Sequence, residues 1–224
     1  MHPKQNAKII TDCAMIFFLP VLMAYSLLGE TLHEWIGLAM LLCLILHHVL
    51  NIHKPSLKTP VARINTALDF VLLIMLLLLM GSGIVLSKTV FRFLPFDGGW
   101  ATARAIHLPL AYWSYILMSV HLGLHLNSIF TALQKMKNVR WLYLKKVALR
   151  IAVMVVSMYG GYAFLSRDFP SYMFLRNHFV FTNYDEPIVC FFADYLAVMT
   201  LFAVLSHLMI KFAQQRKMNK EEIA

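Results

Sequence analysis

The sequence has little charge and little cysteine. Only 14% of its 224 residues are charged and 60% are hydrophobic, whereas about a quarter of the residues in a soluble domain are charged. Its three cysteines lie far apart, and no CxxC pair or CxxCH segment occurs. These absences argue against zinc ribbons, cysteine-ligated iron–sulfur clusters and c-type haem attachment.

A glycine fingerprint for nucleotides is also missing, so the chain has no flavin or nicotinamide domain of its own. The net charge of +9 sits in short segments between apolar runs and not on one continuous face. That distribution is a topology signal. It argues against nucleic acid as a partner and in favour of membrane lipid.

Apolar runs long enough to cross a bilayer dominate what remains. A spanning helix needs about 20 apolar residues, and backbone groups in lipid must bond within their own segment. The sequence therefore predicts an all-α integral membrane protein with about six spans. The expected segments are Ile9–Leu28, His33–Ile52, Ala67–Ser87, Ile106–Phe130, Val147–Ser166 and Val189–Phe212.

Charge asymmetry predicts the orientation of these segments. Fifteen of the 20 lysines and arginines fall on one side of the predicted topology, which makes that side cytoplasmic. We expect both termini inside, in a bacterial inner membrane. The predicted organisation is a four-helix bundle over residues 1–130, a basic cytoplasmic connection over 131–146, and two further helices over 147–224 with an aromatic outer loop. That loop is expected to be a structural lid, with a partner-docking surface as the alternative.

Histidines are the unusual polar residues of this chain. Six of the ten fall in two predicted helices. His33 and His47 are 14 residues apart, and so are His107 and His121. Because 14 residues come within roughly 40° of four full turns, the two histidines of each helix share a face, about 21 Å apart along the axis.

The two helices run in the same direction, so His33 is expected level with His107, and His47 level with His121. Facing imidazoles inside a bundle can ligate a flat iron macrocycle from both sides. A single intramembrane histidine is more often an interhelical hydrogen-bonding group, but the repeated spacing favours iron. Copper held by histidine and methionine is the weaker metal alternative, because the methionines are scattered.

Neighbouring residues complete the predicted cofactor sites. Gly37 and Gly123 can let a macrocycle approach the backbone, although close helix packing explains them equally well. Arg104 is a candidate partner for an outer propionate. His48 competes with His47 for the inner iron, and His125, one turn beyond His121, can instead bond a propionate or a quinone.

These stretches resemble a known family. His33-Glu34-Trp35-Ile36-Gly37, His47-His48-Val49-Leu50-Asn51 and His121-Leu122-Gly123-Leu124-His125 look like the di-haem transmembrane cytochrome b superfamily, which includes the cytochrome b subunits of formate dehydrogenase and hydrogenase. The closest resemblance is to a bacterial branch linked with flavin-carrying extracytoplasmic redox proteins. It implies two haems b, the outer held by His33 and His107 and the inner by His47 and His121.

Three functions compete at this point. The leading one is an electron-transfer subunit between a quinol or cytoplasmic donor and an extracytoplasmic partner, with catalysis left to that partner. The second is a transporter or channel with histidine proton relays, which requires intramembrane carboxylates beside them; Asp12, Asp69 and Asp194 lie near helix ends. The third is a membrane anchor without redox work.

Overall fold

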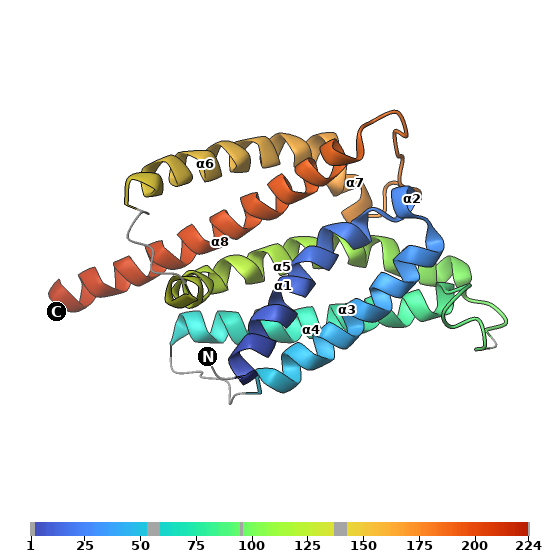
Figure 1. Ribbon diagram of the computed structural model, residues 1–224, viewed down its shortest axis with the longest axis horizontal. Coiled ribbons are helices and arrows are strands. Elements are labelled where there is room, and N and C mark those ends of the chain that lie inside the picture. Colours follow the sequence, from blue (N-terminus) through green and yellow to red (C-terminus); the bar gives the residue numbers. More distant parts are fainter. Residues whose placement is uncertain (1–2, 53–58, 95, 137–142, 224) are drawn as a thin grey trace. The chain divides into compact units, whose positions relative to one another are not determined.

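The computed structural model describes residues 3–52, 59–94, 96–136 and 143–223, and these residues form helices without any strand. Figure 1 shows their order along the chain. The long helices are α1 (Pro3–Met23), α3 (Glu30–Leu50), α4 (Pro60–Leu86), α5 (Trp100–Met136), α6 (Tyr143–Ser166) and α8 (Ile188–Ile223), and the short ones are α2 (Tyr25–Leu28) and α7 (Phe169–Met173). The all-α prediction is confirmed.

The first predicted segment is interrupted near its end. Helix α1 stops at Met23 and the short α2 follows. Gly29 then adopts a φ of 82°, a left-handed conformation that glycine adopts without steric cost. The chain can turn there because no side chain is present, and α3 begins at the next residue.

Five helices are long and apolar enough to cross a membrane: Lys4–Met23, Glu30–Leu50, Pro60–Leu86, Ala148–Ser166 and Ile188–Gln215. Among the described residues, α5 does not meet that criterion. Its sequence mixes histidines, tyrosines, serines and a proline with the apolar residues, which lowers its hydropathy. The multi-pass prediction holds, whereas the sixth span is not confirmed.

The chain divides into two compact units that do not follow its linear order. The first unit comprises Met1–Pro55, Leu73–Tyr115 and Phe169–Phe192, and the second comprises Ser56–Leu72, Ile116–Asp168 and Ala193–Ala224. Helices α4 and α5 thus contribute one end to each unit. The domain boundaries expected at 130 and 147 stay predictions, and residues 137–142 of the basic connection lie outside the described part of the chain.

In the first unit α1 packs along α3 (Figure 1). The aromatic outer loop belongs to this unit and is partly folded as α7. Phe169 and Tyr172 are buried, and both rings contact Tyr112 of α5. The Trp113 indole donates a hydrogen bond to the carbonyl of Met173 at 3.0 Å. This part of the loop is a structural lid, the first of the two interpretations that its sequence allowed.

In the second unit α6 and α8 lie side by side (Figure 1). A β-carbon at Gly160 would collide with the backbone carbonyl of Ala197, so the missing side chain is what allows the two helices to approach. Near the C-terminal end of α6 and the N-terminal end of α8, Arg167 Nε donates to Asp194 Oδ2 at 2.7 Å, and the Tyr159 hydroxyl donates to Asp194 Oδ1 at 2.5 Å. Small residues and a buried ion pair therefore fix this unit.

Candidate functional site

His107 of α5 is held by α4 from one side. Its Nδ1 lies 3.2 Å from the carbonyl of Leu79 and 3.0 Å from Ser82 Oγ, and the serine hydroxyl itself donates to Leu79 O at 2.8 Å. A carbonyl can only accept, so Nδ1 carries the ring proton. The lone pair is then on Nε2, the state in which an imidazole binds a metal.

His33 of α3 faces His107 within the first unit. The two ring centres are 6.2 Å apart and the ring planes meet at 71°. The Tyr25 ring contacts His33 edge-on at 5.2 Å, which limits its rotation. The Nδ1 atom of His33 is buried and makes no hydrogen bond among the described residues. The predicted outer pair is thus brought together.

A cavity of about 120 Å³ surrounds this pair. It is lined by α1, α3, α4, α5 and the start of the connection after α4, and leucine and methionine make up nine of its 19 lining residues. Gly37 lies in its wall, and the nearest atom to a β-carbon there is a Leu22 methyl at 4.0 Å. Gly83 lies behind His107, where a β-carbon would be 3.3 Å from the ring. The missing side chain of Gly37 leaves space in the cavity, and the missing side chain of Gly83 leaves space for the His107 ring.

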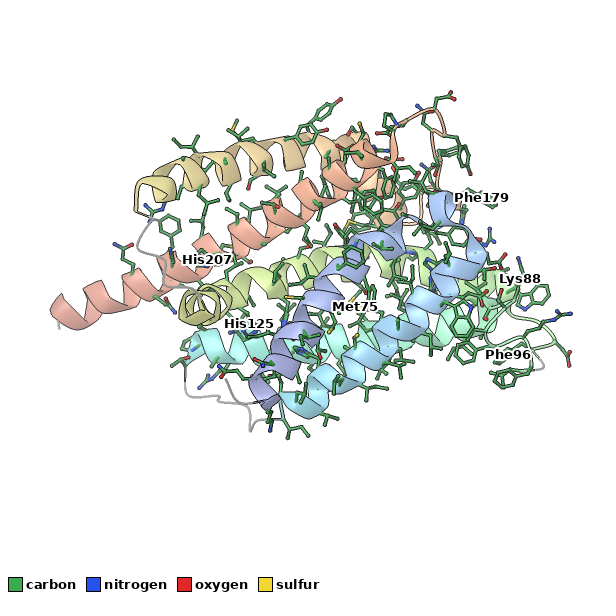
Figure 2. The ribbon with its side chains drawn as sticks, viewed as in Figure 1. Met75, Lys88, Phe96, His125, Phe179 and His207 are labelled. Atoms are coloured by element: carbon green, nitrogen blue, oxygen red, sulfur yellow. The ribbon has the colours of Figure 1, made fainter. Side chains whose placement is uncertain are left out.

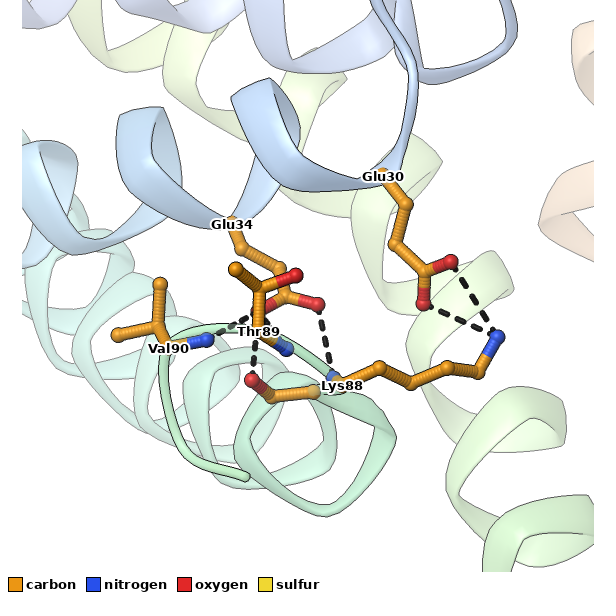
Figure 3. Close-up of polar contacts among 6 residues, drawn as sticks. Glu30, Glu34, Lys88, Thr89 and Val90 are labelled. Atoms are coloured by element: carbon orange, nitrogen blue, oxygen red, sulfur yellow. Dashed lines mark hydrogen bonds and ion pairs between the residues drawn. The ribbon is translucent and has the colours of Figure 1, made fainter. Parts of the chain in front are cut away.

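Glu34, next to His33 on α3, lies in the cavity wall. Its carboxylate accepts the backbone N–H groups of Lys88, Thr89 and Val90 at 2.8–3.0 Å (Figure 3), together with the Ser87 hydroxyl at 2.6 Å. Glu34 and Ser87 both belong to the cavity wall. The start of the connection from α4 to α5, on which Lys88 and Phe96 lie (Figure 2), is fixed to α3 by this carboxylate.

Glu30 makes a second contact with the same segment, at an exposed position. Glu30 pairs with Lys88 Nζ at 3.0 Å on the surface. This partner raises the pKa of Lys88 above its usual value of 10.5.

Arg104 lies three residues before His107 on α5. Its guanidinium sits over the Phe179 ring at 5.6 Å from the ring centre, a cation–π contact. The side chain is exposed, so its donors remain open to a further acceptor. Its proposed role toward an outer propionate stays a prediction.

The inner histidine of α3 has a charged partner. His47 Nδ1 lies 2.7 Å from Asp12 Oδ1 of α1, within the first unit. His48 is different: its Nδ1 donates to the carbonyl of Leu44, one turn back on its own helix, at 2.9 Å. The choice between the two histidines as the inner ligand stays open.

The inner histidine of α5 also meets an aspartate, within the second unit. His121 Nδ1 lies 3.0 Å from Asp69 Oδ1 of α4, although without hydrogen-bond geometry. The His125 ring centre is 4.6 Å from that of His121, and His125 lies on α5 (Figure 2). Ligand atoms of Asp69, His121 and His125 all fall within 4.8 Å of one another, close enough for one metal ion.

Gly123 lies in a close helix contact, which is the second explanation that its sequence allowed. A β-carbon there would collide with the Ala203 carbonyl and the Ser206 hydroxyl of α8, and Ser206 Oγ donates to the Val120 carbonyl at 2.9 Å. The residue is a close-packing glycine between α5 and α8. Of the two explanations that the sequence allowed for Gly123, these contacts support close helix packing, and its place beside a macrocycle stays a prediction.

Sequence reasoning located the histidines but missed their partners. Ser82, Asp12 and Asp69 lie on other helices than the histidines they contact, so nothing in the linear pattern pairs them. His47 belongs to the first unit and His121 to the second, so their shared haem remains a prediction.

The distance between the two imidazole rings of the outer pair is compatible with one metal ion between them. A metal–imidazole bond is roughly 2 Å, and a ring centre lies about 1 Å behind its nitrogen, so two imidazoles on one iron have centres roughly 6 Å apart. The observed value is 6.2 Å. Comparison with known proteins adds no family to this geometry: no family model, curated protein or solved structure matches the chain.

Proposed function

We propose that this chain is a membrane-embedded di-haem cytochrome b that carries electrons across the bilayer. The observation that supports it best is the His33–His107 pair, with ring centres 6.2 Å apart and with the His107 proton held on Nδ1 by an acceptor. Haem supplies one-electron chemistry at its iron when it is bound. The chain supplies axial nitrogens, apolar enclosure and orientation.

The residues around the outer pair fit that group. The cavity wall is almost wholly apolar, with His33, Glu34, His107 and two serines as its polar members. A macrocycle is larger than the 120 Å³ cavity, so leucine and methionine side chains of the wall must shift to admit it. Methionine is suited to such repacking because it is unbranched and flexible.

The second haem belongs to the proposal on the strength of the repeated spacing. His47 and His121 each supply one axial nitrogen, and the family resemblance implies the same ligands. The donor is a quinol or a cytoplasmic reductant, and the acceptor is an extracytoplasmic redox protein that carries its own flavin. The absence of a nucleotide-binding fingerprint from this chain supports that division of labour.

One experiment tests the proposal directly. The full-length protein, expressed with sufficient haem and purified in detergent, is examined by a reduced-minus-oxidised spectrum and by pyridine haemochrome quantitation. A b-type α-band and two haems per chain are expected. A preparation without a Soret band would reject the cytochrome.

A second candidate function also has an observation in its favour. A transporter with histidine proton relays requires carboxylates beside the histidines, and Asp12 beside His47 and Asp69 beside His121 meet that requirement. The test is proton flux into liposomes carrying haem-free protein. Flux that disappears in Asp69→Asn would favour transport, whereas haem-bound protein without flux would favour the cytochrome.

A further inference from the structure

Ser82 of α4 links the His107 ring to the backbone of α4. Its Oγ lies 3.0 Å from His107 Nδ1, and its hydroxyl donates to the Leu79 carbonyl at 2.8 Å. Because the ring proton is on Nδ1, the serine oxygen accepts from the imidazole while its own hydrogen goes to the carbonyl. The Leu79 carbonyl lies 3.2 Å from Nδ1, so Ser82 is the nearer acceptor. All three residues belong to the first unit.

This arrangement goes beyond the usual bond of a serine within a helix. A helical serine commonly donates to a carbonyl about one turn earlier, whatever lies near it. Ser157 of α6 does so, with 8% exposure and a distance of 2.7 Å to the Val153 carbonyl. Ser82 has the same 8% exposure but also accepts from an imidazole on another helix. In the described part of the chain His107 lines the cavity and Ser82 does not, so Ser82 acts on a guest only through that ring.

We propose that Ser82 is a positioning residue that holds the His107 imidazole as an axial ligand and lowers the reduction potential of the outer haem. This inference rests on the proposed function. An acceptor at Nδ1 fixes the orientation of the ring, keeps the lone pair on Nε2 and makes the ligand more electron-donating. A more donating ligand favours oxidised iron, and hydrogen bonding around the ligands is one of the means by which a protein sets a haem potential.

The surroundings of Ser82 strengthen this effect. The serine is buried, and a hydrogen bond is electrostatically stronger in an interior of low dielectric than in water. Without the hydroxyl, His107 Nδ1 would keep only the Leu79 carbonyl at 3.2 Å, which is the long end of the range for N–H···O bonds. Gly83 has no side chain that could restrain the ring in its place. Removal of the hydroxyl should therefore leave a weaker and less well oriented ligand.

The test compares Ser82→Ala with the unaltered full-length protein in potentiometric titrations in detergent, with the haem content measured in parallel. The outer component is defined as the one that His33→Ala removes, so the result does not depend on the ligands of any other haem. In Ser82→Ala we expect an upward shift in the midpoint potential of the outer component and an unchanged haem content. Ser157→Ala is the matched control, because it removes a hydroxyl of equal exposure whose bond runs to a backbone carbonyl. Its outer potential should stay unchanged.

A second variant separates the hydroxyl from the space that the side chain fills. Threonine in a helix can keep the bond to a carbonyl one turn earlier, so Ser82→Thr should have the original outer potential. If Ser82→Ala does not hold the outer haem, Ser82→Thr becomes the test. Outer haem at the original potential in Ser82→Thr then supports the inference.

Three results would overturn the inference while the cytochrome stands. The first is an unchanged or lowered outer potential in Ser82→Ala with full haem content. The second is an equal upward shift in Ser82→Ala and Ser82→Thr, because the hydroxyl would then not be the cause. The third is loss of the outer haem from both variants. An unaltered chain that never binds haem would instead remove the proposed function on which the inference rests.

Discussion

The two compact units make different uses of their glycines. In the first unit, Gly37 and Gly83 border a cavity that His33 and His107 line. In the second, Gly160 and Gly123 bring helix backbones into contact. The same residue type thus leaves space beside side chains in one unit and allows close helix packing in the other.

The largest effect is expected when one of the two candidate haem ligands in the cavity is removed. His107→Ala and His33→Ala should each reduce the haem content from two per chain to one, because one imidazole cannot hold a low-spin b haem from both sides. Pyridine haemochrome quantitation and the loss of one component in a redox titration measure this. Retention of both haems in His33→Ala would show that His33 is not a ligand. His207→Ala, on α8 (Figure 2), is the control and should keep both haems.

Gly83 tests whether space behind the ligand matters. A valine at this position would push against His107, because even a β-carbon there would lie only 3.3 Å from the imidazole ring. We expect Gly83→Val to lose most of the outer haem signal while the inner signal persists. Gly81→Val is the matched control, two residues away on the same helix, because a β-carbon there meets nothing within 4 Å. Equal spectra for the two variants would contradict this account of the cavity.

A neighbouring pair of glycines tests the close packing of the second unit. Gly160→Ala places a methyl group against the Ala197 carbonyl, and overpacking of this kind costs roughly 1–3 kcal/mol. Gly161→Ala meets nothing within 4 Å, and a helical alanine at an open position stabilises by about 0.4–1 kcal/mol. Thermal unfolding in detergent should therefore move in opposite directions for the two variants. A shift of the same sign in both would mean that α6 and α8 are not tightly packed at Gly160.

The sequence was sufficient for the helical class and for the outer pair of histidines, whereas the sixth span and the pairing of His47 with His121 stay predictions. Apolar length predicts a spanning helix, and the matched heights of histidines on two parallel helices predict the approach of His33 to His107 that is observed. The sequence did not decide the role of Gly123, because the pattern around an isolated glycine is the same whether a cofactor or a backbone carbonyl lies against it. The aspartate partners were also out of reach, because Asp12 and His47 meet only through the packing of α1 on α3, which no periodicity specifies.

A final comparison concerns two glutamates on α3 that contact the same segment. Glu34→Gln weakens hydrogen bonds to three backbone N–H groups, and hydrogen bonds to a charged group contribute about 1.5–3 kcal/mol each where they are protected from water. Glu34 is partly exposed, so we expect the lower end of that range in thermal unfolding. Faster loss of the outer haem to an excess of apomyoglobin should accompany it.

Glu30→Gln is the matched control and should change the unfolding temperature little, because exposed ion pairs add little stability. Its small effect has a defined pH dependence. The pKa of Lys88 is raised by Glu30 above the usual 10.5, so the stabilisation is fully present below that pH and is lost as the pH rises through the raised value. The difference in unfolding temperature between Glu30→Gln and the unaltered chain should therefore vanish in strong alkali. The corresponding difference for Glu34→Gln should persist there. If Glu30→Gln lowered the unfolding temperature more than Glu34→Gln, this segment would be held to α3 mainly by the Glu30–Lys88 ion pair and not by the backbone N–H groups that donate to Glu34.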